Sequence, residues 1–432
     1  MNTRSPSHTI DRVVDSNLDT STQQAHLPRG SKTIVVPFLK TTYLEIVQDG
    51  SKFKDYLDGQ YKRYPELFPR AMKNGYQLDG FTEQSIKLKL IQRRIRIKDT
   101  NEDYTIRPSF VMPYMTGYVE DVQKGVLLMN FNVPFWVISR VLGKNPMYWW
   151  RIHASLGRNS IVGTTIKDEE KIPKNIVADE KVTWMNGKEI NVATIAGGDC
   201  VLGAAICTDR SEKGLEESYG VFKEEAQNVK PDYAPESVNT DGSKMLQNAF
   251  KSLFSGIIII LCYLHFVLKI KERGKRLGSL FHEIMNRAWH VYHAETKVIF
   301  SQRMRRFKEW AIKNVNAPAV LDKILRLCAN SKMFQLFYDH KSAHRTSNMI
   351  DRLMDKQDRF LYRMKYFHGN FISAELEIRA WAILMNFCPY CPRATHNKDD
   401  WICAAQKVNG FRYSDDWLEN LLISSSMNGY RQ

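Results

Sequence analysis

The clearest succession of hydrophobic and polar segments lies between residues 238 and 264. Residues 238–240 form a short strand-like segment that ends at Asp241, and residues 243–254 then place apolar side chains at helical spacing. After a Ser-Gly break comes the solid apolar run IIIILCYL, which is typical of a strand buried on both faces and is too short to span a membrane. The pattern predicts a strand, a helix and a parallel strand. Asp241 would then lie at the sheet edge where open α/β folds bind ligands.

Three further strands are predicted upstream, over residues 175–185, 188–197 and 200–208. An Asn-Gly pair separates the first two, which is a strong hairpin signal, and Gly-Gly-Asp separates the second from the third. Residues 211–229 then follow a helical pattern. The predicted order is therefore three antiparallel strands, a helix, a strand, a helix and a strand.

Downstream of this region the pattern becomes helical. Residues 266–345 contain amphipathic helices, and two long helices follow within residues 346–390. Residues 391–432 are mixed and interrupted by proline, so we expect a C-terminal tail region there.

Three short helices are predicted over residues 119–158. Pro134 and Pro146 suit the first turns of the second and third helices, and Gly143 closes the second. A trio with a tight Gly-Lys-Asn turn is the layout of a helix-turn-helix, whose last helix enters the major groove of DNA. In that layout the candidate DNA-reading residues are Lys144, Asn145, Tyr148 and Arg151. The alternative is that the three helices are simply packed together by Trp149, Trp150 and Ile152.

The N-terminal part divides into two regions. Residues 1–31 are polar and are expected to form a disordered tail, whereas residues 32–118 suggest a small α+β region with basic strands. Within it, apolar residues alternate with Lys or Arg over residues 86–90 and 94–98, which predicts one or two half-buried strands with a basic face. Such strands could lie along a phosphate backbone. The alternative is a surface strand whose charges protect a sheet edge.

Charge is distributed unevenly along the chain. The 432 residues carry a formal charge of +15, with +11 in residues 266–345 and −5 in residues 176–265. An acidic sheet followed by basic helices suits an enzyme that binds metal with one part and a polyanion with the other. A solvated basic face is the alternative.

Cysteine usage and the N-terminal segment bear on the compartment. Seven cysteines at irregular spacing indicate a reducing compartment, and the first residues lack the apolar core of a secretory signal. We therefore expect a cytoplasmic protein without a membrane partner.

Several segments together carry a family resemblance. Asp241-Gly242, the apolar helix, the hydrophobic strand and the C-x-x-H of Cys262 and His265 resemble the second catalytic carboxylate and following signature of mutator-like DDE transposases. Five further strings resemble segments of a bacterial and cyanobacterial insertion-sequence branch, in the same order: PSFVMPYM (108–115), GRNSIVGTT (157–165), ADEK (178–181), YGVFKEEA (219–226) and TSNMIDRLM (346–354).

The resemblance implies a fold and a division into domains. It implies an α/β ribonuclease-H-like catalytic core formed by residues 172–265 and 346–390, interrupted by an all-α insertion at residues 266–345. A helical, helix-turn-helix-like DNA-binding region at residues 119–158 would precede this core.

The resemblance also implies that Asp179 and Asp241 are catalytic. Asp179 lies in the first strand of the core and Asp241 ends the fourth, so neighbouring strands would bring the two carboxylates together. Because two close carboxylates repel each other unless a cation neutralises them, and because the ligands are hard oxygens, we expect Mg²⁺ or Mn²⁺, two ions in all. Glu180 is excluded because neighbouring strand residues point to opposite faces.

The third acid is assigned to Asp351. It follows Asn348 by three residues on one helix face, and the resemblance is to a motif with that spacing in which relatives often carry Glu. Glu375 and Glu377 are alternatives.

Other candidate residues surround these acids. The resemblance implies that His265 lies beside the metals or the scissile phosphate, and a hydrogen-bonded core histidine is the alternative. Cys388 and Cys391 form a lone C-x-x-C, for which a structural or incidental role is expected. In the helical insertion, basic residues and an aromatic could clamp DNA ends, although the aromatic could equally be a core residue: Arg303, Arg305, Arg306, Lys308 and Trp289.

The resemblance thus implies a nucleoid-associated bacterial transposase that cuts and joins double-stranded DNA, both its terminal inverted repeats and target DNA. Paired ends make a homodimer the expected assembly. Two alternatives stay open: a catalytically inactive or domesticated DNA-binding protein of the same fold, and a related nuclease without strand transfer.

Overall fold

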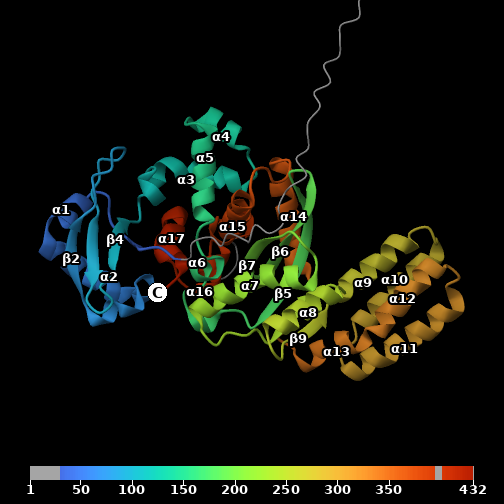
Figure 1. Cartoon of the computed structure of the whole chain (residues 1–432). Helices are drawn as coiled ribbons and strands as arrows, with labels where there is room; N and C mark the ends of the chain where they lie inside the picture. The colour runs from blue at the N-terminus through green and yellow to red at the C-terminus, as the bar shows by residue number, and fades with distance from the viewer. Residues whose placement is uncertain (1–29, 395–400, 432) are drawn as a thin grey trace, which may run out of the picture.

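The computed structural model describes residues 30–394 and 401–431. Figure 1 shows an N-terminal sheet, a group of helices beside it, a central sheet and a helical bundle at the far end. The chain is therefore a mixed α/β protein, as predicted. The predicted tail at residues 1–31 lies outside the described residues except for its last two positions. Among the described residues, every helix is too short or too polar to serve as a membrane span.

The central sheet has the strand order β7-β6-β5-β8-β9. Its first three strands pair antiparallel, whereas β8 pairs parallel with both β5 and β9. Their bounds are β5 (Asn175–Met185), β6 (Lys188–Gly197), β7 (Cys200–Cys207), β8 (Ser237–Thr240) and β9 (Ile258–Leu261). Asn186 and Gly187 both have positive φ in the β5–β6 turn, which is what an Asn-Gly hairpin turn requires. The three predicted antiparallel strands are confirmed.

The last strand is shorter than predicted. β9 ends at Leu261, and Cys262 is the N-cap of the helix α9 (Tyr263–Gly274), so His265 lies in the first turn of that helix. The apolar run continues beyond the strand because Tyr263 is buried under the helical bundle, where its hydroxyl donates to the carbonyl of Ala288. A continuous apolar run cannot by itself separate a buried strand from a buried helical turn.

Helices cover both faces of the central sheet. On one face, α7 (Glu212–Val229) and α8 (Lys244–Leu253) bury Tyr219, Phe222 and Phe250. On the other, α14 (Asn348–Arg363) packs on β5 and β6, where Gln357 donates to Thr194 at 3.2 Å, and α15 (Phe371–Phe387) packs on β7. These helices match the predicted helical segments.

An all-helical bundle separates β9 from α14, as the pattern of residues 266–345 predicts (Figure 1). After α9 its helices are α10 (Ser279–Tyr292), α11 (Lys297–Asn314), α12 (Pro318–Ala329) and α13 (Ser331–Asp339). Their buried side chains belong to the same hydrophobic cluster as the α7 face of the sheet. The bundle is therefore packed against the sheet domain.

The N-terminal sheet has the order β1-β4-β3-β2 and is accompanied by two helices. The bounds are β1 (Thr33–Val36), α1 (Tyr43–Gln48), α2 (Gly50–Arg63), β2 (Tyr76–Phe81), β3 (Arg93–Ile97) and β4 (Asp103–Pro108).

The prediction of half-buried strands with a basic face in this region is only half right. Residues 94–98 overlap β3, but residues 86–90 form a turn in which Ile86 is 96% exposed, so no strand exists there. The basic face of β3 is neutralised within the sheet, because Arg94 pairs with Asp79 and Arg96 with Asp103. These arginines are therefore poorly suited to holding a phosphate backbone.

Three helices follow: α3 (Val119–Asn130), α4 (Phe135–Leu142) and α5 (Pro146–Leu156). All three predicted helices are confirmed. Trp149 is 1% exposed and its Nε1 donates to the carbonyl of Gly143 at 2.9 Å, which fixes the turn between α4 and α5.

The C-terminal region is not a tail. Residues 401–431 contain α16 (Ala404–Asn409) and α17 (Trp417–Ser424), and the leucines of α17 are buried in the same hydrophobic cluster as α15. Beyond α17, the Ser426 hydroxyl donates to the carbonyl of Leu67 and accepts from the amide of Val35. This region thus ties the N-terminal sheet to the rest of the protein.

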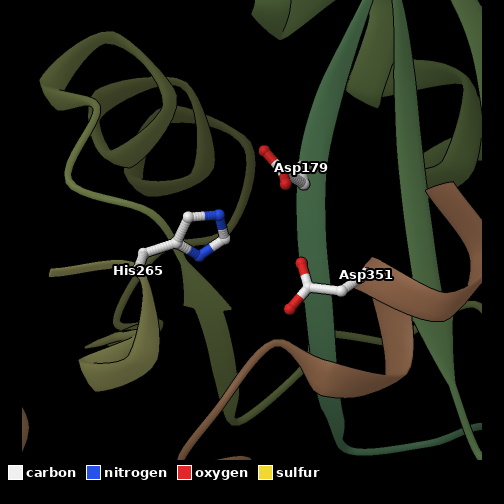
Figure 2. A group of neighbouring side chains, drawn as sticks. All are labelled: Asp179, His265 and Asp351. Carbon is white, nitrogen blue, oxygen red and sulfur yellow. The ribbon is translucent and has the colours of Figure 1, made fainter. Parts of the chain in front are cut away.

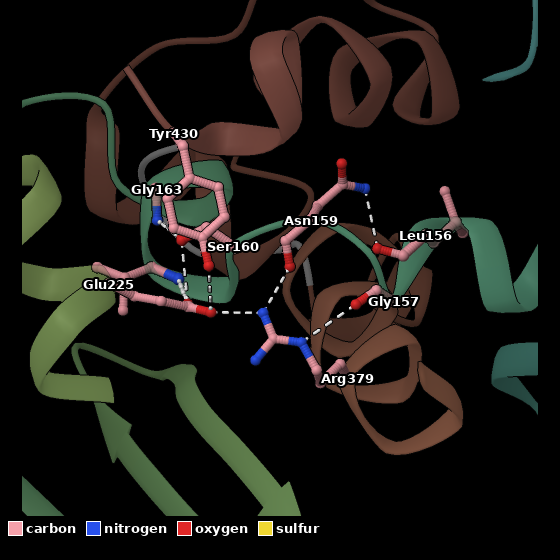
Figure 3. Close-up of polar contacts among 9 residues, drawn as sticks. Leu156, Gly157, Asn159, Ser160, Gly163, Glu225, Arg379 and Tyr430 are labelled. Atoms are coloured by element: carbon pink, nitrogen blue, oxygen red, sulfur yellow. Dashed lines mark hydrogen bonds and ion pairs between the residues drawn. The ribbon is translucent and has the colours of Figure 1, made fainter. Parts of the chain in front are cut away.

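A buried ionic cluster joins α7, α15 and the segment after α5 (Figure 3). The Glu225 carboxylate pairs with Arg379 and accepts hydrogen bonds from the Ser160 hydroxyl, the Val162 amide and the Tyr430 hydroxyl. Arg379 also donates to the carbonyls of residues 157 and 159. We call this the Glu225 cluster. It gives the GRNS segment a structural role, because this segment supplies most of the backbone groups that bind the pair.

Candidate active site

The register of the central sheet places two predicted acids side by side. In the parallel β5–β8 pair, Val177 lies opposite Asn239. Two residues further along each chain come Asp179, within β5, and Asp241, directly after β8. Neighbouring strands lie about 4.8 Å apart, so the two backbone positions are adjacent.

The third predicted acid reaches the same place from another element. Asp351 lies in the first turn of α14, which packs on β5. Figure 2 shows the side chains of Asp179, His265 and Asp351 converging from a strand and two helices. One ligand atom of each lies within 4.8 Å of the others. The fold therefore gathers three residues that lie up to 172 positions apart in the sequence.

Ser347 connects the members of this group. Its hydroxyl donates to Asp351 Oδ2 at 3.1 Å and lies 3.2 Å from His265 Nδ1 and 3.1 Å from the Cys262 sulfur. Its amide also donates to the Cys262 sulfur. The C-x-x-H motif and the start of α14 are thus joined through one buried serine. The sequence pattern alone did not identify Ser347 as part of the site, although it directly precedes Asn348.

The charges of the group perturb one another. Burial raises the pKa of Asp179 to about 6, opposed by the positive charge of His265 and reinforced by Asp241 and Asp351. The pKa of His265 is raised to about 9, chiefly by its hydrogen bond with Cys262 and also by the two carboxylates. His265 is therefore protonated at neutral pH and acts as the counter-charge of the acids.

Asp241 is adjacent to this group but is turned partly away from it. Its Oδ1 accepts from the amide of Ser243 at 2.7 Å, and its Oδ2 lies 3.9 Å from Lys269 Nζ. Among the described residues, the close donor group contains Asp179, His265 and Asp351 but not Asp241. The carboxylate is still near enough to raise the pKa of Asp179.

The alternative acids lie elsewhere. Glu375 accepts from the amide of Ile206 at 2.8 Å, and Glu377 accepts from Trp150 Nε1 at 2.6 Å, so neither shares the site. Glu180 faces the α7 side of the sheet, where Tyr219 and Arg210 lie near its carboxylate. Burial, with Asp179 and Asp241, raises its pKa to about 7. Its exclusion as a partner of Asp179 agrees with this geometry.

The donor group fits a divalent cation. Two oxygens on one magnesium or manganese ion are at most about 4 Å apart, so a group within 4.8 Å needs only a small adjustment. Carboxylates suit Mg²⁺ and Mn²⁺, whereas an imidazole donor shifts the preference toward Mn²⁺ and other transition metals. Asp179 and Asp351 can hold one cation, and His265 becomes a third donor only after it loses its proton. A second cation would need Asp241 to turn toward it.

The predicted DNA-reading residues of α5 divide into two pairs. Lys144 and Arg151 are exposed. Asn145, in contrast, caps α5 by accepting from the amide of Met147 at 2.8 Å, and the half-buried Tyr148 donates to the carbonyl of Thr116 at 3.3 Å. Asn145 and Tyr148 therefore have structural roles, whereas the exposed Lys144 and Arg151 are accessible to a ligand.

The predicted DNA contacts of the helical bundle also differ among themselves. Trp289 is half-buried and packs edge-on against Tyr292 with ring centroids 5.4 Å apart, which favours the core alternative. Arg303 donates to the carbonyl of His290, and Arg305 lies 3.7 Å from Glu309. Lys308 is exposed. Arg306 is exposed too, and neither Arg306 nor Lys308 has a bonded partner among the described residues, so these two are the available cations of the set.

All seven cysteines have free thiols, so Cys388 and Cys391 form no disulfide. Cys388 is buried at the end of α15, whereas Cys391 is exposed. Neither Cys388 nor Cys391 belongs to the donor group formed by Asp179, His265 and Asp351.

No protein-family model matches this chain, and comparison with curated proteins finds no match either.

Proposed function

We propose that this protein is a DNA transposase of the DDE type with a ribonuclease-H-like core. One observation carries the proposal: Asp179 on the central strand and Asp351 on a helix beyond an all-helical insertion converge with His265 at one end of the sheet, and Asp241 follows the parallel neighbouring strand beside them. The strand order and the position of the insertion support the same assignment.

The chemistry of the site supports phosphoryl transfer on DNA. A divalent cation held by Asp179 and Asp351 would activate the nucleophile, which is a water molecule or the 3′-hydroxyl of a DNA strand, and would stabilise the leaving oxygen. The protein's own residues would attract the substrate and orient the groups of the site. The positive His265 faces the acids and attracts a phosphodiester, and Ser347 orients both His265 and Asp351 through its hydroxyl.

The distribution of charge supports a DNA substrate. The all-helical insertion carries the chain's largest positive excess and follows directly on the strand that leads to His265. The exposed Arg306 and Lys308 of this insertion would attract the phosphate backbone of DNA. The exposed Lys144 and Arg151 offer a second contact for recognition of the element ends.

A second candidate is a DNA-binding protein of the same fold that does not cut. The position of Asp241 favours it, because this carboxylate is bound to Ser243 and Lys269 rather than to the donor group. If that arrangement persists when cation and DNA are present, the site has only two converging acids.

Strand cleavage tests the proposal. The substrate is DNA bearing the inverted repeats that flank the coding region, incubated with the purified protein and Mn²⁺ or Mg²⁺. We expect 3′-hydroxyl ends to be released and then joined to a target plasmid. Asp351→Asn should abolish cleavage and leave DNA binding intact.

Asp358→Asn is the matched control, because Asp358 lies on the same helix but pairs with Lys181 at 2.5 Å on the exposed side. It should cleave like the unchanged protein. Binding without cleavage by the unchanged protein would support the second candidate, and cleavage without joining would indicate a nuclease. Cleavage by Asp351→Asn would refute the assignment of that acid.

A further inference from the structure

A polar cavity of about 240 Å³ lies where the N-terminal sheet, the end of α5 and the C-terminal segment meet. Its walls include two arginines, Arg107 of β4 and Arg158 after α5, together with several hydroxyl and amide side chains. None of the described residues that line it is Asp or Glu. We call it the Arg107 cavity. Its charge is therefore positive and is not neutralised by its own walls.

Arg107 is a buried cation, and none of the acids in the described part of the chain is paired with it. It is 6% exposed, and its Nη1 donates to the carbonyl of Val111 at 3.1 Å. Its Nε is buried and has no hydrogen-bond partner among the described residues. Burial lowers the pKa of Arg107 to about 10, so the guanidinium still carries its charge at neutral pH. A guanidinium has five N–H donors, and most of those of Arg107 stay available.

Hydroxyl groups lie on the same side of the sheet as this guanidinium. Thr105 and Arg107 are two residues apart on β4 and so share one face, and Thr33 lies opposite Thr105 on β1. Both threonines line the cavity, and within the described part of the chain their hydroxyls make no hydrogen bond. The cavity thus combines a buried charge with free neutral donors.

A second cation stands at the wall formed by the end of α5. Arg158 is exposed, and the described residues include no acid paired with it. Two guanidinium groups and nearby hydroxyls suit a compact anion with several acceptor oxygens, because arginine binds such groups through two parallel hydrogen bonds. A tetrahedral oxyanion satisfies these donors better than a planar carboxylate, which has only two oxygens.

We propose that the Arg107 cavity binds a phosphate group. Free inorganic phosphate, a nucleotide and the backbone of bound DNA all carry this group. The site lies in the N-terminal region and uses none of the residues at Asp179, so the inference is independent of the proposed catalysis. Bound phosphate would also fasten together the three parts of the chain that form the cavity walls.

Thermal unfolding of the full chain tests the proposal. Inorganic phosphate should raise the unfolding midpoint in a saturable way by several degrees, compared with sodium chloride of equal ionic strength. Gln92→Glu should weaken phosphate binding at least tenfold, because Gln92 lines the cavity and the new carboxylate would add a negative charge to its walls. Gln77→Glu is the matched control, because Gln77 is an exposed residue of β2 outside the cavity.

Arg158→Gln gives a second test at an exposed position, where a folding defect is not expected. It should lower phosphate affinity several-fold and leave the midpoint without phosphate unchanged. Equal effects of phosphate and chloride would overturn the proposal. So would unchanged phosphate affinity in both Gln92→Glu and Arg158→Gln.

Competition identifies the source of the phosphate. Calorimetric titration with inorganic phosphate is repeated in the presence of AMP or of a DNA duplex without terminal phosphates. If the duplex competes, the site holds a phosphodiester of bound DNA. If only AMP competes, it holds a free phosphate or a nucleotide.

Discussion

The Glu225 cluster and the group of acids at Asp179 differ in how far their charges are neutralised within the protein. In the Glu225 cluster, one carboxylate receives an arginine and three further hydrogen-bond donors, and the carboxylate raises the pKa of Arg379 despite its burial. At the sheet edge, Asp179 accepts one backbone hydrogen bond and faces two other acids across a single histidine. The first arrangement is complete within the protein. The second has an excess of negative charge that a cation would relieve.

The difference between the two clusters separates buried charges that stabilise the fold from buried charges that are suited to binding a ligand. A charge whose donors all come from the chain stabilises the packing around it, and removing one partner leaves the other uncompensated. A carboxylate with a raised pKa, held near other carboxylates, opposes folding until something binds it. The same substitution of charge by a neutral side chain should therefore have opposite consequences in the two places.

The largest expected effect is that of Asp179→Asn. DNA cleavage should fall by roughly a thousandfold or more, because the carboxylate that positions the cation is lost. The unfolding free energy should meanwhile rise or stay unchanged without divalent cation, because the cost of burying this carboxylate's charge is removed, together with its repulsion by Asp241 and Asp351. Cleavage assays and urea unfolding measure the two results. A variant that is both inactive and strongly destabilised would contradict the comparison.

Arg379→Met should behave in the opposite way. It leaves Glu225 buried without its cation, so the unfolding free energy should fall by about 3–5 kcal/mol. Arg326→Met is the control, because Arg326 is exposed and pairs only with Asp322 one helical turn away. It should change stability by less than about 1 kcal/mol. Equal losses of unfolding free energy in Arg379→Met and Arg326→Met would show that the Glu225 cluster stabilises the fold no more than a surface ion pair does.

Ser347→Ala should have an intermediate effect. The hydroxyl orients His265 and Asp351, so cleavage should fall by roughly 10–100-fold. The loss should appear in kcat rather than in DNA affinity. Ser347→Thr keeps a hydroxyl and should restore part of the activity. If Ser347→Ala cleaves normally, the hydroxyl has no part in orienting the catalytic groups.

The smallest expected effect is on the pH dependence of stability. Folding raises the pKa of Asp179 from 3.8 to about 6, so the folded state binds more protons between these values. The unfolding free energy should therefore fall as pH rises through this window, by about 1–3 kcal/mol for this group. The difference between the unchanged protein and Asp179→Asn, measured by urea unfolding in chelator at pH 4 and pH 7, isolates it. A difference that does not vary with pH would contradict the cause given for the shift.

Local signals predicted much of the central fold. The Asn-Gly turn after Met185 and the alternation on either side of it fixed the β5–β6 hairpin, and the Asp241-Gly242 break separated β8 from α8. These features depend on neighbouring residues, which is why pattern alone finds them.

Features that depend on distant contacts were not predicted. The end of β9 before Cys262 reflects the packing of Tyr263 under the bundle, and the folded C-terminal region reflects contacts of Ser426 with the N-terminal sheet. The role of Ser347 depends on two motifs that meet only in the fold.

The site was predicted in part for the same reason. Asp179, His265 and Asp351 come together, and periodicity alone gave no sign that Lys269 would bind Asp241.

Titration of Mn²⁺ into the full chain tests the central claim most directly. Isothermal calorimetry without DNA should show saturable binding to the unchanged protein and to Asp358→Asn. Binding should be lost, or weakened by at least tenfold, in Asp179→Asn and in Asp351→Asn. Equal Mn²⁺ affinity in all four proteins would mean that these acids do not form a cation site, and the proposed chemistry would lose its basis.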